Sequence, residues 1–232
     1  MLVAVTGPAE GGRGGLRARQ RAEARARLLR AAKEVFEEKG FLDVRVADIA
    51  GRAGVSHGLF YHYFDSKKDV FRELATMVDR ELTDTIDVML DRSSGATPYE
   101  RLRKSIRVHF ERYRDEARMM ALIEEVSRYD DDVRAAREEL HAAEIGRVVE
   151  AIRQLQRRGL ADERLDPEIA AVVIEAMTWN FAERWLVRGE LDRDFDACVD
   201  QFFVMLTNTL RITEGPGSPV GGASRGRTSQ NT

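Results

Sequence analysis

Apolar residues recur at helical spacing along most of the chain, and almost no stretch shows the alternation expected of a β-strand. Early in the chain, Leu28, Leu29, Ala32 and Val35 mark one face of a helix that ends at Gly40. Helices are predicted at about residues 18–39, 46–53, from 56 onward, 66–92, 98–114, 117–128, 131–158, 167–188 and 195–212. The pattern therefore predicts an all-α protein of about nine helices.

Two of the predicted helices are short and follow each other closely. The first has the sequence VADIAGRA and is broken by Gly54, and Ser56 is placed to cap the start of the second with its hydroxyl group. Two short helices joined by a tight turn that contains glycine form the helix-turn-helix arrangement. In DNA-binding proteins the second of these helices enters the major groove.

The last two predicted helices are apolar on more than one face, so each must be covered on more than one side. Two explanations are open: they are central helices of a monomeric bundle, or they form an interface with a second copy of the chain. Their place at the end of the chain favours the interface. The residues predicted to form it are Val173, Met177, Trp185, Phe195, Val199, Phe202, Phe203, Leu206 and Leu210.

Composition sets the two ends of the chain apart from its middle. Residues 1–17 and 214–232 are poor in large apolar residues and rich in glycine and other small or polar types, so both segments are predicted to be disordered. The sequence shows no signal peptide and no apolar run that would span a membrane. The lone Cys198 fits a reducing compartment. We expect a cytoplasmic protein with no membrane partner.

Charge is distributed unevenly. The whole chain has a net charge of −3, but residues 1–72 hold 14 Lys or Arg against 9 Asp or Glu, so this part is +5 and the remainder is −8. A basic head on an acidic body is expected where one part meets phosphate and the other does not. Arginines that precede or open the first helix either reach along a duplex or form a solvated basic tail. They are Arg13, Arg17, Arg19, Arg21, Arg25 and Arg27.

Rings and histidines crowd the segment from His57 to Phe64. Helical spacing assigns Phe60 and Phe64 to a small core and leaves the residues between them facing outward. Outward-facing Tyr61 and His62 would donate to phosphate oxygens, whereas His57 and Leu59 at the helix start would reach base edges or a thymine methyl group. Gly58 leaves a bare backbone there, which lets a helix approach DNA closely. A helical hairpin with exposed aromatic residues and no DNA partner is the structural alternative.

At the centre of the segment 21–71 stands DIAGRAGVSHGLFYHYFDSKKDVF, which resembles the DNA-binding domain of the TetR (TetR/AcrR) family of bacterial transcriptional regulators. The resemblance implies a helix-turn-helix DNA-binding domain at 18–65, followed by a helical domain for effector binding and dimerisation at 66–213. It also implies a homodimer that binds a pseudo-palindromic operator as a repressor and is released by a small lipophilic effector. An activator or a ligand-independent regulator of the same fold is the alternative.

Two positions depart from the family pattern. Arg45 stands where the family commonly has a threonine that caps the second helix, and the loss of this cap costs about 1 kcal/mol. Asp43 is a candidate replacement cap. His57 stands where lysine is frequent, which would make binding dependent on pH. The residues expected to contact DNA are Arg45, Ser56, His57, Gly58, Leu59, Tyr61, His62 and Lys67, the last of which would grip a phosphate.

The middle helices carry a mixture of rings, methionines and a few polar groups that suits a small lipophilic ligand. The residues predicted to line its pocket are His109, Phe110, Tyr113, Met120, Ile123, His141, Met177, Asn180 and Phe181. The same residues are also compatible with an ordinary core. The spacing of the histidines does not support a metal site, and no motif of a nucleophile elbow, a phosphate-binding glycine loop or a zinc enzyme is present, so neither a cofactor nor catalysis is expected.

Overall fold

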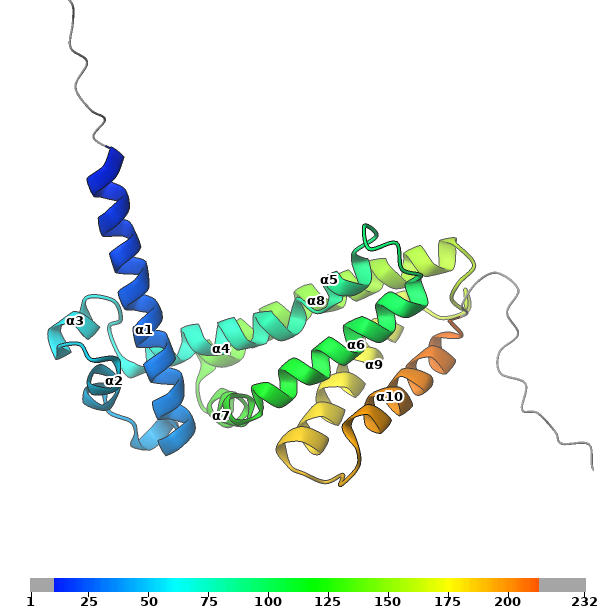
Figure 1. The fold of residues 1–232 in the computed structure, drawn as a ribbon. Helices are drawn as coiled ribbons and strands as arrows, with labels where there is room; N and C mark the ends of the chain where they lie inside the picture. Colours follow the sequence, from blue (N-terminus) through cyan, green and yellow to red (C-terminus); the bar gives the residue numbers. More distant parts are fainter. Residues whose placement is uncertain (1–10, 213–232) are drawn as a thin grey trace, which may run out of the picture. The chain divides into compact units, whose positions relative to one another are not determined.

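The computed structural model describes residues 11–212 of the chain. The predicted disordered segment at 214–232, and most of the one at 1–17, lie outside these residues. The elements follow one another as helices, with no strand in the described part of the chain (Figure 1). The all-α class and the architecture predicted from the periodicity are therefore confirmed.

Helix α1 (Gly11–Asp43) begins earlier than predicted, so residues 11–17 belong to a helix. The alanine- and arginine-rich sequence that follows favours helix, and an existing helix is extended at little cost for each added residue. Near its other end α1 is interrupted at Gly40, where φ is 76°. Glycine adopts this left-handed conformation without the strain that a side chain would cause. The predicted stop at Gly40 therefore corresponds to a sharp kink.

The described chain divides into two compact units. The first unit consists of residues up to 78 and residues 118–134, and the second consists of residues 79–117 and those from 135 onward. The first unit thus contains a part of α4 (Lys67–Thr83), α7 (Ala117–Ser127) and the start of α8 (Asp131–Arg157) in addition to α1. The two units are defined by contacts between segments that can be distant in the sequence. The boundary predicted after residue 65 separates two functions instead, and it stays a prediction.

The first unit is built around large, fully buried side chains of α1, of α2 (Val46–Ala53) and α3 (His57–Tyr61), and of α4. Rings of Phe36, Phe41 and Phe71 contact one another at centroid distances of 4.8–5.8 Å. Ile49 and Phe60 are completely buried beside them. Edge-to-face ring contacts add stability beyond that of the buried area. The packing of α1 against α4 therefore gives α2 and α3 a stable core to pack on.

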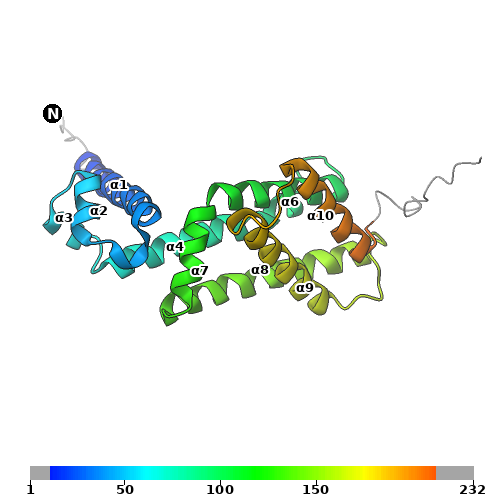
Figure 2. The same cartoon turned by 90° about the horizontal axis from the view of Figure 1, so that it is seen from below.

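The second unit contains α5 (Ile86–Leu90), α6 (Pro98–Asp115), most of α8, α9 (Pro167–Ala182), the π-helical turn η1 (Glu183–Val187) and α10 (Phe195–Leu210). Phe110 on α6 lies at the centre of a group of rings and has no exposed surface. It contacts Phe181, Trp185 and Phe202, which joins α6 to α9, η1 and α10 (Figure 2). Among the described residues, no helix is both long and apolar enough to cross a membrane.

One predicted helix is divided in two. The segment 66–92, read as a single helix from its apolar stripe, is α4 followed by α5, with a break between Thr83 and Ile86. Hydroxyl groups bond to the backbone at this break: Thr83 donates to the carbonyl of Arg80, and Thr85 donates to that of Leu82 at 2.8 Å. Threonine side chains that bond to the backbone compete with regular helix, which explains a break that apolar periodicity does not record.

Candidate DNA-binding surface and ligand cavity

The turn between α2 and α3 has the geometry of a helix-turn-helix motif. Gly54 adopts φ 65° and ψ 35°, and the next residue, Val55, donates its backbone N–H to the carbonyl of Ala50 at 3.0 Å. This bond closes the C-terminus of α2 in the way that a left-handed glycine favours. Ser56 then caps α3, because its Oγ accepts from the backbone N–H of Leu59 at 3.2 Å.

Helix α3 presents one buried face and one exposed face. Phe60 is completely buried, whereas Tyr61 has half of its surface exposed and His57, Gly58 and His62 are exposed as well. The rings of His57 and Tyr61 contact edge to face at 5.3 Å, so they form a single surface. Leu59 is half-buried at its side. The structure therefore brings the predicted α3 residues together on one exposed surface, which we call the α3 surface.

No steric reason within the described residues requires glycine at position 58. Its backbone is helical, and a Cβ atom built there would approach only the Oγ of Ser56, at 4.0 Å. Glycine in the first turn of a helix costs up to about 1 kcal/mol relative to alanine.

The start of α2 is held by a residue that the sequence reasoning missed. Arg45 is the N-cap and makes no side-chain cap, as expected, but Asp48 accepts a hydrogen bond from the Arg45 backbone N–H at 2.9 Å. Asp48 also accepts from Lys39 at 2.8 Å, and this bond holds the pKa of the Asp48 carboxyl below its ordinary value. The pattern of an acidic residue three positions after the N-cap could have identified it. Asp48 therefore takes the place considered for Asp43, and Arg45 is exposed.

The ammonium group of Lys67, which is expected to grip a phosphate, is engaged within the first unit. Its ammonium group donates to the carbonyls of Phe41, Leu42 and Val44, each at 2.9 Å, and lies 5.0 Å from the centre of the Phe41 ring. An ammonium has three donors, and all three are used. In this structure Lys67 joins the start of α4 to the segment after the Gly40 kink, and a phosphate contact would have to replace one of these bonds.

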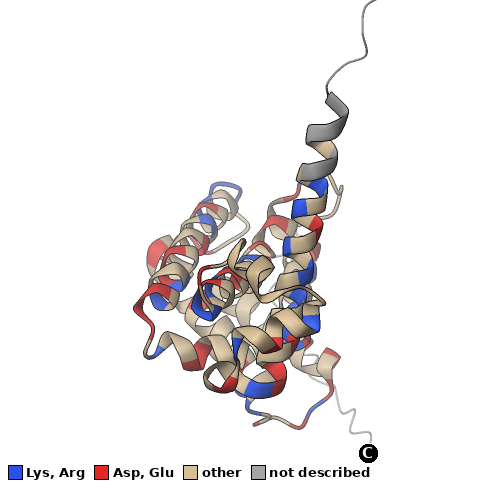
Figure 3. Ribbon diagram, turned by 90° about the vertical axis from the view of Figure 1, so that its left-hand side faces the viewer, with Lys and Arg blue, Asp and Glu red and all other residues tan. Residues whose placement is uncertain are grey.

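Figure 3 colours the described Lys and Arg positions blue. The arginines of α1 are only partly available for DNA. Arg19 pairs with Glu23 at 3.0 Å, Arg21 bonds to the ring Nε2 of His62 at 3.2 Å, and Arg25 pairs with Glu73. Arg27 is exposed. The side chains of Arg13 and Arg17 lie outside the described residues. Much of the charge that the sequence assigns to a DNA-binding arm thus supports the first unit itself.

The second unit contains a cavity of about 80 Å³. Its wall is mostly aliphatic, and its polar members are Thr85, Ser105, His109, Glu144 and Thr178. The apolar lining residues are Ile86, Met89, Leu102, Ile106, Val148, Ala151, Ile152, Leu155, Ile174, Leu206, Leu210 and Ile212. Typical ligand pockets enclose about 300–1,000 Å³, so this cavity holds only a small group unless it widens.

Of the residues predicted to line a pocket, His109 lies in the cavity wall and the others do not. Phe110 and Tyr113 are buried in ring packing, and Met120 and Ile123 are buried in the first unit, so these four are core residues where they stand. Three more line a separate open hollow beside α9 and η1; they are Met177, Asn180 and Phe181. His141 is paired with Glu175 at 2.9 Å. The periodic apolar pattern identified buried positions but could not tell core from cavity.

Sequence reasoning missed Glu144. Position 144 stands in line with Val148, Ala151 and Leu155 at helical spacing, on the face of α8 that lines the cavity. A glutamate within an apolar stripe was the available signal. Its carboxylate accepts a hydrogen bond from the indole N–H of Trp179 at 3.3 Å.

Burial shifts the pKa of both titratable residues in the cavity wall. Burial lowers the pKa of His109 from 6.5 to about 4, and burial raises the pKa of Glu144 from 4.5 to about 7. His109 also lies in edge contact with the Trp179 ring, at 5.4 Å, and Trp179 stacks on His141 at 4.4 Å. At neutral pH the imidazole is therefore uncharged and the carboxyl is close to its midpoint.

These two shifts should have opposite effects on stability between pH 4.5 and 6.5. The stability contributed by neutral His109 is present above pH 6.5 and is lost as the pH falls towards 4, whereas that of protonated Glu144 is present below pH 4.5 and is lost as the pH rises through 7. Glu144→Gln should remove the second effect and make the protein lose about 2–3 kcal/mol more than wild type between pH 7 and pH 4.5. Urea unfolding at both pH values measures this, with His109→Phe expected to show the opposite difference. Identical pH slopes in all three proteins would contradict the assignment.

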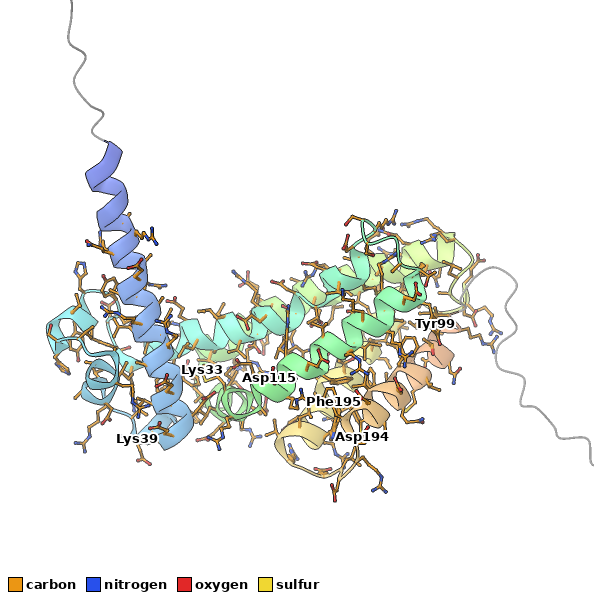
Figure 4. The ribbon with its side chains drawn as sticks, in the orientation of Figure 1. Lys33, Lys39, Tyr99, Asp115, Asp194 and Phe195 are labelled. Carbon is orange, nitrogen blue, oxygen red and sulfur yellow. The ribbon has the colours of Figure 1, made fainter. Side chains whose placement is uncertain are left out.

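The residues predicted to form the dimer interface differ in how much of their surface is exposed. Trp185, Val199, Phe202 and Phe203 are buried within a single chain, as are Leu206 and Leu210, so they belong to the core of the second unit and do not form its surface. Phe203 contacts Tyr99 of α6 at 4.7 Å, and Phe195, half-buried at the start of α10, stacks on Trp185 at 5.2 Å. Tyr99 and Phe195 are labelled in Figure 4. Met177 is half-buried. The ring contacts explain why these apolar residues face inward.

A different apolar face is exposed on the same two helices. On α9 it consists of Ile169, Val172 and Val173, and on α10 of Val204 and Met205; each has about half or more of its surface exposed. Ile169, Val172 and Val173 recur at helical spacing and form one stripe on α9, whereas Val204 and Met205 are adjacent in the sequence of α10. We call them the α9/α10 face. Of the predicted interface residues, only Val173 belongs to it.

The fold and the α3 surface define a helix-turn-helix regulator of transcription. Residues 28–74 match the family described as bacterial regulatory proteins, tetR family. The HTH-type transcriptional repressor BepR of Brucella suis biovar 1 is 27% identical over 190 residues, which cover 77% of this chain and 86% of BepR. The HTH-type transcriptional regulator TtgR of Pseudomonas putida is 26% identical over 171 residues, covering 71% and 81% of the two chains.

Solved structures agree on the fold. FadR from Bacillus subtilis, determined in complex with stearoyl-CoA, aligns with a TM-score of 0.65 and 21% identity over 78% of this chain and 96% of that one. Residues 28–74 thus match the tetR family of bacterial regulatory proteins, and over most of its length the chain is similar to HTH-type regulators of transcription. These similarities support a DNA-binding regulator of transcription.

Proposed function

We propose that the chain acts in the cytoplasm as a homodimeric repressor that binds a pseudo-palindromic operator through the α3 surface and is released by a small effector. The observation that carries the proposal is the exposed side of α3, where His57, Gly58 and Tyr61 lie together on a helix anchored by buried Phe60. Gly58 has no steric reason within its own unit, and close approach of a DNA backbone supplies one.

Rigid positioning of α2 supports this role. Arg52 on α2 bonds to both Glu34 and Glu38 of α1, at 3.1 and 2.6 Å, and Lys39 bonds to Asp48 from the same helix. These exposed pairs contribute little to stability individually, but together they fix the orientation of α2 on α1. Helix α3 follows α2 after a tight turn, so a fixed α2 helps to hold α3 in the register that reading base edges requires.

The exposed α9/α10 face supports a homodimer, and a homodimer calls for an operator with two-fold symmetry. An apolar patch exposed on neighbouring helices is costly in water and is typical of a surface that a partner covers. Two copies related by a two-fold axis would bury the same face of each chain and present two α3 helices to successive major grooves, about 34 Å apart.

The cavity supports release by an effector. An effector has to bind the DNA-free conformation more tightly than the DNA-bound one, because only a difference in affinity shifts the population. Helix α4 begins in the first unit and ends in the second. Near its end, the backbone carbonyl oxygen of Leu82 lies 3.4 Å from Nδ1 of His109, a residue of the cavity wall. A ligand that moves His109 therefore acts on the end of a helix that continues into the DNA-binding unit.

The proposal is tested by the DNA that the protein retains. Purified protein is incubated with fragments of its own source's genomic DNA at about 0.15 M salt, and the retained fragments are sequenced. Tyr61→Ala should weaken binding to the retained motif about 5- to 100-fold, because it removes a contact of about 1–3 kcal/mol. Tyr129→Ala is the matched control, since Tyr129 is exposed to a similar degree but belongs to the turn between α7 and α8 and not to α3. Retention without a two-fold motif, equal in all three proteins, would contradict the proposal.

A further inference from the structure

The polar atoms in the cavity wall are almost all acceptors. Three hydroxyl groups face the cavity, and each has its proton engaged by a backbone carbonyl: Thr85 donates to Leu82, Ser105 to Thr85 at 2.8 Å, and Thr178 to Ile174 at 2.7 Å. A hydroxyl whose proton is used offers a ligand only lone pairs. The wall therefore has no free hydroxyl donor for a ligand.

His109 adds a further acceptor. The side chain is 4% exposed, and its Nδ1 lies 3.4 Å from the carbonyl oxygen of Leu82, which requires the proton to be on Nδ1. Its other nitrogen, Nε2, is buried and has no hydrogen-bond partner among the described residues. A buried polar atom without a partner is costly and rare in native structures, and a ligand donor would satisfy it.

Glu144 adds charge. One carboxylate oxygen accepts from the indole N–H of Trp179. The charged groups that face Glu144 are His141 and Arg147 on α8 and Glu175 on α9. Arg147 is already engaged by the Thr83 carbonyl, Asp84 and Asp87, and Glu175 by His141. The carboxylate thus lacks a cation of its own in an apolar wall.

We propose that the effector of this cavity is an apolar primary amine, bound as its ammonium ion between the Glu144 carboxylate and Nε2 of His109. This inference rests on the proposed function and names the chemical class of its effector. An ammonium supplies both the charge and the donors that the wall lacks, and its alkyl chain lies against the aliphatic residues. A carboxylate ligand would instead meet the like charge of Glu144 and acceptor atoms where it needs donors. Burial alone raises the pKa of Glu144 to about 7, and a bound cation favours the ionised form.

The test uses butylammonium, butanol and butanoate as probes of equal chain length, since the cavity of about 80 Å³ admits only a short chain. Binding is measured by calorimetry on the full-length protein at pH 8. Butylammonium should bind, and Glu144→Gln should weaken its binding about 10- to 100-fold, as expected for loss of a charge-assisted hydrogen bond. Glu139→Gln, an exposed residue on the same helix, is the control for the change in charge and should bind as wild type does.

A pH series supplies a readout that a structural role of Glu144 would not move. Affinity for butylammonium should rise from pH 6 to pH 8 as Glu144 ionises, and this rise should be absent in Glu144→Gln. Equal affinity for butylammonium and butanol, tighter binding of butanoate, or no binding of any probe would each overturn the proposal. Operator retention by the same preparations without any probe separates its failure from that of the proposed function, because binding of the operator in the absence of an effector does not depend on which ligand the cavity accepts.

Discussion

Replacing Asp79 by alanine should lower the free energy of unfolding by about 3–5 kcal/mol. Asp79 has no exposed surface, and its Oδ2 lies 3.2 Å from Nε of Arg137, whose side chain is only 14% exposed. The pair joins α4 to α8 within the second unit. Removing one partner of a buried pair leaves the other charge poorly compensated, which costs far more than the intact pair contributes.

Urea unfolding measures this loss, with Asp87→Ala as control. Asp87 also pairs with an arginine, Arg147 at 3.1 Å, but its side chain is 64% exposed, so its loss should cost at most about 1 kcal/mol. The double replacement Asp79→Leu with Arg137→Leu should recover much of the lost stability, because neither charge of the pair then remains buried. A loss below about 1 kcal/mol for Asp79→Ala would show that the buried pair does not hold α4 and α8 together.

Placing a charge on the α9/α10 face should separate the proposed dimer and weaken operator binding about 100- to 10,000-fold. In a two-fold interface, Val173→Glu or Met205→Glu introduces the new carboxylate twice, in an apolar surface where neither has a partner. A monomer binds one half-site at a time and loses the effective concentration that links the second binding event to the first.

The measurements are molar mass by sedimentation and affinity for the operator identified from retained DNA. Met77→Glu is the matched control, because Met77 is an exposed methionine of α4 outside the α9/α10 face, and it should leave the molar mass unchanged. Circular dichroism confirms that each variant is folded, which is expected because Val173 and Met205 are exposed in the single chain. A dimeric mass for both α9/α10 variants would place the interface elsewhere.

The helices and the helix-turn-helix could be predicted from sequence because they depend on local signals. Apolar periodicity, Gly40 as a stop, Ser56 as a cap and Pro98 in the first turn of α6 act within a few residues of their position. The break after Thr83 was missed because threonine hydroxyls bonding to the backbone leave the apolar stripe intact.

The roles of individual site residues depend on which faces meet in the fold. Lys67 is of a residue type that often contacts phosphate, yet its three donors are used by backbone carbonyls more than twenty positions away in the chain. Phe202 is of a residue type that is common in interfaces, yet its ring contacts those of Phe110 and Phe181 of the same chain. Such assignments need tertiary contacts, which a periodic pattern does not contain. Two missed residues did leave a local signal: Glu144 as a charge in an apolar stripe, and Asp48 as an acidic residue three positions after the N-cap.

A footprint of the wild-type protein on its operator tests the central claim most directly. Two α3 surfaces of a dimer should protect two short segments, related by two-fold symmetry, on one face of the duplex and about one helical turn, or roughly 34 Å, apart. Tyr61→Ala should lose both segments at the protein concentration at which wild type protects them. A single unsymmetrical protected segment, or protection that ignores sequence and persists in Tyr61→Ala, would contradict binding by a dimer through α3.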